Sequence, residues 1–208
     1  KSVAIAPAEL EAAFEEGIGF DGSAIEGLTR VSEDDMLVRP DASTFQILPL
    51  SSGENSTARM FCDVLTPEGE PSLGDSRNVL KNALDNAKGK GFSFYCHPEI
   101  EFYLFRHQND WTRPPVPIDE GGYFDQVPRS SSMDFRRAAV SQLEDLGIPV
   151  EFSHHETGPG QNEIDLRHAG ALNTADSIMT FRTIVKEISL DRGIYASFMP
   201  KPLADQPG

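Results

Sequence analysis

The stretch HPEIEFYLF, residues 97–105, decides the fold. Successive side chains of a β-strand point to opposite faces, so Glu99 and Glu101 share one face and the apolar residues that alternate with them share the other. Apolar side chains occur on both faces, which indicates a strand covered on both sides. Two carboxylates on such a strand are costly to bury unless a cation or an arginine compensates them. The alternative is a strand edge that lies in water.

A second acidic stretch, HHETGPGQNEIDLRHA, occupies residues 154–169. Glu156 and Glu163 flank its Gly-Pro-Gly turn, and pairing of the flanking strands as a hairpin would bring both carboxylates to one face. Mg²⁺ and Mn²⁺ prefer oxygen ligands, so four clustered glutamates would suit a site that uses ATP. His154 and His155 point to opposite faces of their strand, so at most one is expected to be catalytic, and both also fit ordinary strand-end histidines.

Around these two stretches, the periodicity predicts an α+β chain. A short helix follows Pro7 and ends at Gly17, and two strands over 44–48 and 59–64 flank a turn over 51–56. The turn-rich segment 66–71 predicts a domain boundary, with domains over 1–71 and 72–208. The second domain is expected to contain helices over 75–87, 132–146 and 174–191, and strands over 92–97, 99–105, 150–155, 161–167 and 196–199.

The composition excludes several classes of partner. The 208 residues carry 33 acidic and 18 basic side chains, a formal net charge of -15, which repels nucleic acids and anionic lipid surfaces. No apolar segment approaches the length of a membrane span, and no signal-peptide pattern opens the chain, so a cytoplasmic location is expected. Cys62 and Cys96 lie far apart without metal-binding spacing and are expected to be reduced. Lys1 in place of an initiator Met and the final Gly208 suggest a piece of a longer protein.

Seven motifs together carry a family resemblance. In order they are FDGSAIEG, SEDDM, RPDASTF, HPEIEFYLF, GYFD, HHETGPGQNEID and FMPKP, and their order and spacing resemble those of glutamine synthetases of the bacterial type. Alone, FDGSAIEG and the downstream acidic residues would be ordinary surface turns. The resemblance implies a small β-grasp-like N-terminal domain, followed by the first part of an antiparallel-sheet catalytic domain.

The resemblance also implies an activity, namely ATP-dependent ligation of ammonium to the γ-carboxylate of L-glutamate through γ-glutamyl phosphate, with Mg²⁺ or Mn²⁺. Glu101, Glu156 and Glu163 match ligands of the metal that serves the glutamate side. Glu99 matches a ligand of the metal that bridges the ATP phosphates. Glu151 matches a position that contacts the nucleotide. His154 matches a position near the transferred phosphate.

By the same resemblance, Asp21 matches the aspartate that binds and deprotonates ammonium, and it reaches the site from a neighbouring subunit. Asp35 and Tyr123 match residues that line the same region. The family typically assembles as two stacked hexameric rings, so a homo-oligomeric dodecamer is expected.

Departures from the family pattern leave alternatives open. Ala24 stands where the family usually has a serine, beside the ammonium pocket, so a polyamine or ethanolamine ligase is the alternative enzyme. The family's second half, with further metal ligands and glutamate-binding arginines, is not in this sequence. The 208 residues alone are therefore expected to be inactive, and a non-catalytic role in binding or assembly is the alternative from another class.

Overall fold

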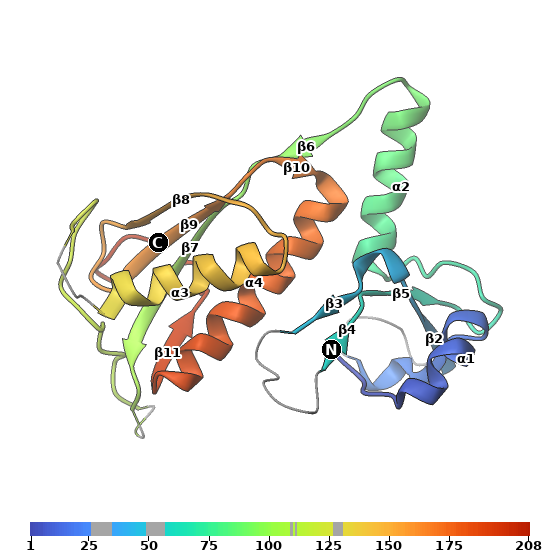
Figure 1. Ribbon diagram of the computed structural model, residues 1–208, viewed down its shortest axis with the longest axis horizontal. Helices are drawn as coiled ribbons and strands as arrows, with labels where there is room; N and C mark the ends of the chain where they lie inside the picture. The colour runs from blue at the N-terminus through green and yellow to red at the C-terminus, as the bar shows by residue number, and fades with distance from the viewer. Residues whose placement is uncertain (26–34, 49–56, 109, 111, 127–130) are drawn as a thin grey trace. The chain divides into compact units, whose positions relative to one another are not determined.

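The chain forms two compact units, Lys1–Phe94 and Tyr95–Gly208 (Figure 1). The computed structural model describes residues 1–25, 35–48, 57–108, 110, 112–126 and 131–208. The turn predicted over 51–56 and most of the SEDDM motif lie outside the described residues. The domain boundary after residue 71 stays a prediction. The helix α2 (Ser76–Gly89) belongs by its contacts to the first compact unit.

The first unit is built around a small antiparallel sheet. Its strand order is β1-β2-β5, with β1 Ile18–Asp21, β2 Asp35–Pro40 and β5 Cys62–Leu65. A 3-10 turn (Pro7–Glu9) leads into α1 (Leu10–Glu15), which packs against β2 and buries Ala13, while Met36 is buried on β2. A second, two-stranded sheet pairs β3 (Gln46–Ile47) with β4 (Ala58–Arg59).

Charged side chains attach α2 to this sheet. Asp75 caps the helix, because its carboxylate accepts hydrogen bonds from the backbone N–H of Arg77 and of Val64 on β5. Arg77 then forms ion pairs with Asp41 at 2.8 Å and with Asp63 at 2.6 Å. The helix is therefore held by a cap and an ion-pair network.

The second unit is a four-stranded antiparallel sheet in the order β11-β7-β9-β8. Its strands are β7 Glu99–Arg106, β8 Val150–His155, β9 Gln161–Leu166 and β11 Ile194–Ser197. Two helices, α3 (Ser131–Asp145) and α4 (Ala171–Asp191), lie side by side against one face (Figure 1). A separate two-stranded sheet pairs β6 (Tyr95–Cys96) with β10 (Ala169–Gly170).

Aromatic side chains fill the space between the sheet and the helices. Phe102 on β7 lies 5.9 Å from Phe135 of α3, 5.9 Å from Phe181 of α4 and 5.8 Å from Phe198, measured between ring centroids. Phe102, Phe135 and Phe181 are almost fully buried, and each such side chain stabilises the fold by about 1.5–3 kcal/mol relative to exposure. This packing occupies one face of the sheet, and on the opposite face of β7 Glu99 and Glu101 precede the buried, stacked rings of Tyr103 and Phe105.

In the first unit, β1 and β2 were not predicted, the strand expected over 44–48 shortens to β3, and the strand expected over 59–64 divides into β4 and β5. Most predicted elements of the second unit are confirmed, but the strand expected over 92–97 shortens to β6. That segment is not covered on both sides within the described chain, because Phe92, Phe94 and Tyr95 are mostly exposed. None of the described helices combines the length and the apolarity that a membrane span needs.

Candidate active site

Three neighbouring strands bring site residues into one row. β7 pairs with β9 so that Glu101 lies opposite Glu163, and β8 pairs with β9 so that His154 lies opposite Glu163. Directly opposite residues of an antiparallel pair point to the same face. Glu101, Glu163 and His154 therefore share the face that the helices do not cover. The sequence predicted that Glu156 and Glu163 would share a face, and the pairing of β7 with β9 adds Glu101 opposite Glu163.

The Gly-Pro-Gly turn brings a third carboxylate to this row. The backbone N–H of Glu156 donates to the Gln161 carbonyl at 2.9 Å, which closes the hairpin between β8 and β9. His154 Nδ1 lies 3.3 Å from Glu156 Oε1, and His154 Nε2 lies 3.7 Å from Glu163 Oε2. The imidazole thus stands between two carboxylates, while Gln161 Nε2 donates to Glu101 at 2.5 Å.

The electrostatics of the row favour a bound cation. Burial raises the pKa of Glu163 well above the usual range for a glutamic acid, and the adjacent Asp165 and Glu156 carboxyls raise it further. Partial desolvation also raises the pKa of Glu101, and the Gln161 hydrogen bond opposes this shift. Carboxyl groups that resist ionisation beside one another are stabilised as anions when a cation binds between them.

One acidic residue of this face was missed in the sequence reasoning. Asp165 is 6% exposed, and its Oδ1 has no hydrogen-bond partner among the described residues. Ligand atoms of His154, Glu163 and Asp165 lie within 4.8 Å of one another. Strand alternation could have revealed it, because Gln161, Glu163 and Asp165 occupy every second position of β9. An oxygen-rich donor set with an unpaired buried carboxylate oxygen fits a hard divalent cation.

The opposite face of β8 is fixed by a buried polar network. His155 Nε2 lies 2.9 Å from Asp119 Oδ1, which also accepts from the Gly160 backbone N–H at 3.0 Å. Burial opposes ionisation of Asp119, but hydrogen bonds from His155 and Ser132 hold its pKa well below the usual range. Burial likewise opposes the charged form of His155, and the bond to Asp119 raises its pKa above the ordinary value. Of the two adjacent histidines, His154 alone belongs to the carboxylate row.

Aromatic rings cover one side of His154. The Tyr123 ring centroid lies 5.7 Å from that of His154, and the Phe124 centroid lies 4.6 Å from it. The Phe124 backbone N–H donates to the His155 carbonyl at 3.0 Å, which ties this segment to β8. Tyr123 itself is 57% exposed, so it borders the row without being buried in it.

Glu99 and Glu151 lie beside the row. Glu99 is exposed and lies opposite Asp165. This pair is two residues along the strands from the pair of Glu101 and Glu163. The register of β8 shifts between Val150 and Phe152, so Glu151 is the extra residue of a β-bulge. Its carboxylate lies 3.3 Å from His97 Nε2.

Asp21 and Asp35 belong to the first unit. They end β1 and begin β2 as cross-strand partners. The Ser23 backbone N–H and hydroxyl donate to Asp21 Oδ1 at 2.9 and 2.6 Å, and these hydrogen bonds lower the pKa of Asp21. The exposed Asp21 carboxylate is therefore ionised at neutral pH.

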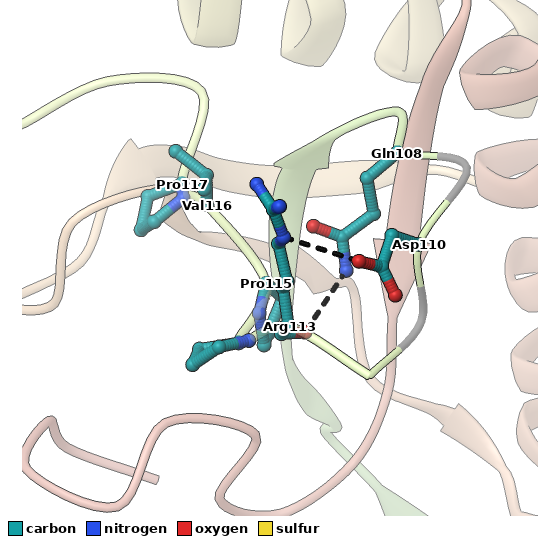
Figure 2. A pocket seen from close by; sticks show the side chains of 7 residues that line it. Gln108, Asp110, Arg113, Pro115, Val116 and Pro117 are labelled. Atoms are coloured by element: carbon teal, nitrogen blue, oxygen red, sulfur yellow. Dashed lines mark hydrogen bonds and ion pairs between the residues drawn. The ribbon is translucent and has the colours of Figure 1, made fainter.

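A pocket after β7 is separate from these residues. Figure 2 shows it to be lined by Gln108, Asp110, Arg113 and the run 114–117. Arg113 Nε lies 3.1 Å from Asp110 Oδ2, and Gln108 Nε2 donates to the Arg113 carbonyl (Figure 2). None of the site residues predicted from the sequence lines this pocket.

Comparison with known proteins accounts for both parts of the chain. The family described as "Glutamine synthetase, beta-Grasp domain" matches residues 1–67, and "Glutamine synthetase, catalytic domain" matches residues 73–208. The chain is 60% identical over its whole length to a glutamine synthetase of Mycolicibacterium smegmatis and 59% identical to one of Mycobacterium tuberculosis. It covers 47% of each of these proteins, so it spans about half the length of the curated relatives it matches.

Solved structures show the same architecture. The structure of a GmaS/ADP complex matches with a TM-score of 0.88 at 28% identity, over 100% of this chain and 47% of the other. The predicted fold class is confirmed: α+β, with a β-grasp N-terminal domain and part of an antiparallel-sheet catalytic domain.

Proposed function

The chain belongs to the glutamine synthetase family, and from this premise we propose that the whole protein ligates ammonium to the γ-carboxylate of L-glutamate, with ATP as co-substrate. The observation that carries the proposal is the row of Glu101, Glu163 and His154 across β7, β9 and β8. Such a row concentrates negative charge in a partly buried place, which suits divalent cations and the phosphates that they accompany.

The proposed reaction has two steps. An oxygen of the glutamate γ-carboxylate attacks the terminal phosphorus of ATP, the bond to the bridging oxygen breaks, and ADP leaves with γ-glutamyl phosphate formed. Ammonium gives a proton to the Asp21 carboxylate, and the ammonia formed attacks the γ-carbonyl carbon. The carbon–oxygen bond to phosphate then breaks, inorganic phosphate leaves, and loss of a second proton to solvent gives glutamine. The first step activates a carboxylate that would otherwise not react with an amine.

Within this chain, Glu101, Glu156 and Glu163 would hold one divalent cation, Mg²⁺ or Mn²⁺, and Glu99 would contribute to a second. When bound, these ions supply Lewis-acid stabilisation of the negative charge on the transferring phosphoryl group. Gln161 orients Glu101 through its hydrogen bond at 2.5 Å. His154, between Glu156 and Glu163, would donate a hydrogen bond to a phosphate oxygen near the row.

The first unit would supply the ammonium end of the site to a neighbouring subunit. Asp21 is exposed and its pKa is lowered, so it carries the negative charge that attracts an ammonium ion. Asp35 lies beside it in register, and Tyr123 would line the same region from the second unit. This arrangement makes a homo-oligomeric ring, a dodecamer in the family pattern, part of catalysis.

Nucleotide binding has support from a structural relative. GmaS, at 28% identity, has been solved as an ADP complex. Glu151, in the bulge of β8, is the residue that we assign to nucleotide contact. We expect the protein in the cytoplasm, where ATP is available and where Cys62 and Cys96, both free, would stay reduced.

Release of inorganic phosphate from ATP by the purified full-length protein tests the function. With glutamate and Mg²⁺ present, ammonium should support faster release than putrescine, spermine or ethanolamine at matched concentration. Glu163→Gln should lower the rate roughly 100-fold or more, because it removes a charged ligand of the cation. The matched control Asp145→Asn, at the exposed end of α3, should retain the wild-type rate.

One observation favours a second amine as acceptor. Ala24 lies in the 3-10 turn Gly22–Ala24 directly after Asp21, where a serine hydroxyl of the family pattern is missing. A pocket with one hydroxyl fewer is less polar and suits an amine with an alkyl chain. If ammonium is the poorest acceptor in the assay, the protein is a polyamine or ethanolamine ligase. If no amine supports phosphate release, a binding or assembly role replaces catalysis.

A further inference from the structure

We propose that Asp165 is a further carboxylate ligand of the metal site, on the side of the row that faces Glu99. This inference rests on the proposed function, because it takes the cation site of Glu101, Glu156 and Glu163 as its premise. It adds a residue that neither the sequence motifs nor the family resemblance assigned.

The sheet register places Asp165 between the two groups of glutamates. Asp165 is two residues after Glu163 on β9, so both side chains point to the same face. Its cross-strand partner on β7 is Glu99, and its partner on β8 is Phe152. Asp165 therefore lies next to Glu163 along its own strand and next to Glu99 across the sheet.

Burial of Asp165 calls for a positively charged or hydrogen-bonding partner. The residue is 6% exposed, and its Oδ1 has no hydrogen-bond partner in the part of the chain that the structure describes. A buried carboxylate oxygen without a partner has lost its hydration without compensation, and native proteins seldom leave one unsatisfied. Glu163 adds a second carboxyl at the same place, which increases the need for a cation.

The neighbouring donor atoms have the right chemistry for a metal ion. Atoms of Asp165, Glu163 and His154 lie within 4.8 Å of one another, so a single ion would reach both carboxylates. The carboxylate oxygens of Asp165 and Glu163 suit Mg²⁺ and Mn²⁺, and the nearby His154 nitrogen stays available to a phosphate oxygen. This donor group overlaps the row of Glu101 and Glu163, so Asp165 extends that site instead of forming a distant one.

Binding of Mn²⁺ alone, without ATP or glutamate, tests the proposal on the full-length protein. Free Mn²⁺ is measured by electron paramagnetic resonance across a titration of wild type, Asp165→Asn, Glu163→Gln and the surface control Asp145→Asn. Asp165→Asn should weaken Mn²⁺ binding roughly tenfold or more, because amide oxygen is a weaker and uncharged ligand. The control should stay within about twofold of wild type.

The outcomes separate this proposal from the proposed function. Affinity of Asp165→Asn within about twofold of wild type, with binding lost in Glu163→Gln, would overturn the role of Asp165 and leave the function standing. Wild-type affinity in both variants would overturn the metal assignment itself.

A measurement on the wild type covers the case in which Asp165→Asn does not fold. Anomalous scattering from crystals grown with Mn²⁺ should locate an ion within about 2.5 Å of an Asp165 oxygen. An ion bound by Glu101 and Glu163 but more than about 4 Å from Asp165 would contradict the proposal, since direct metal–oxygen bonds are much shorter.

Discussion

Gln161 is the residue through which the carboxylate row is connected to the Gly-Pro-Gly turn. Its side chain is almost fully buried and forms two hydrogen bonds. Nε2 donates to Glu101 on β7 at 2.5 Å, and Oε1 accepts from the Gly158 backbone N–H at 2.9 Å. One amide therefore orients a proposed metal ligand and satisfies a buried backbone donor of the turn.

At the residue scale, Gln161→Met should lower the free energy of unfolding by about 1–3 kcal/mol, because the buried Gly158 N–H loses its acceptor. Urea denaturation measures the change. Gln142→Met is the matched control, since Oε1 of Gln142 is buried without a partner among the described residues. It should not lower stability, because it removes an unpaired buried amide oxygen, and equal losses in both variants would contradict the role of Gln161.

The hairpin of β8 and β9 is the element that shapes the site. Its turn brings Gly160 against β7, where the Leu104 backbone N–H donates to the Gly160 carbonyl at 2.8 Å. Gly160 has a φ of +70°, and an added Cβ would lie 2.6 Å from the Leu104 carbonyl oxygen. Both the backbone conformation and the close approach require glycine here.

At the element scale, Gly160→Ala should be more destabilising than Gly147→Ala. Gly147 ends α3 with a φ of +74°, but a Cβ there would meet no atom within 4 Å. Gly147→Ala should therefore cost only the backbone strain of about 1–2 kcal/mol. Gly160→Ala adds a steric clash, and its loss should exceed that of Gly147→Ala by about 1 kcal/mol or more in chemical denaturation. Equal losses would show that the turn relaxes away from β7.

Within the whole molecule, the first unit depends on ion pairs to hold its long helix. Arg77 is 10% exposed and contacts Asp41 and Asp63, and Lys81 adds a second contact to Asp63 at 2.5 Å. The apolar residues of α2 contribute less than their spacing predicts, because Val79 is 56% exposed. Charge therefore replaces part of the apolar packing that usually attaches a helix.

At this scale, Arg77→Met should lower the free energy of unfolding by roughly 1–3 kcal/mol at neutral pH. The Ser43 hydroxyl and Arg77 hold the pKa of Asp41 in the folded protein below its ordinary value of 3.8. Ionised Asp41 therefore contributes its full stabilisation above about pH 4, and this stabilisation is lost as the pH falls through the lower pKa of the folded protein. The difference between wild type and variant should therefore shrink below about pH 4 in thermal melts.

The surface pair of Arg137 and Asp134 provides the control for this prediction. Its atoms are 3.9 Å apart and both side chains are more than half exposed. Arg137→Met should change stability by less than about 1 kcal/mol at neutral pH. A pH-independent loss in Arg77→Met would show that the helix loses packing contacts and not an ion pair.

The sequence predicted the second unit better than the first for physical reasons. Helices 132–146 and 174–191 contain strong apolar periodicity, and the structure places α3 and α4 there. β1 and β2 are short and carry mixed polar and apolar residues, so alternation gave little signal. Periodicity also identifies an apolar face without showing whether anything covers it, which explains the exposure of Tyr95 and Val79.

The sequence predicted only those parts of the candidate site that depend on residues close together in the chain. Alternation placed Glu99 with Glu101, and the turn predicted that Glu156 and Glu163 would meet, because both relationships are local. The pairing of β7 with β9 is non-local, and it alone shows that Asp165 lies opposite Glu99 and that Gln161 lies opposite Tyr103. Asp165 and Gln161, whose positions depend on this pairing, were therefore not identified from the sequence.

The strand order has a consequence for folding kinetics. β7 and β9 are neighbours in the sheet, but α3 and β8 lie between them in the chain, so their pairing requires closure of a long loop. The carboxylate row cannot exist in an intermediate where only the local hairpin of β8 and β9 has formed. Because Glu101 joins the row only through this pairing, a cation that needs the complete row should slow unfolding more than it accelerates folding.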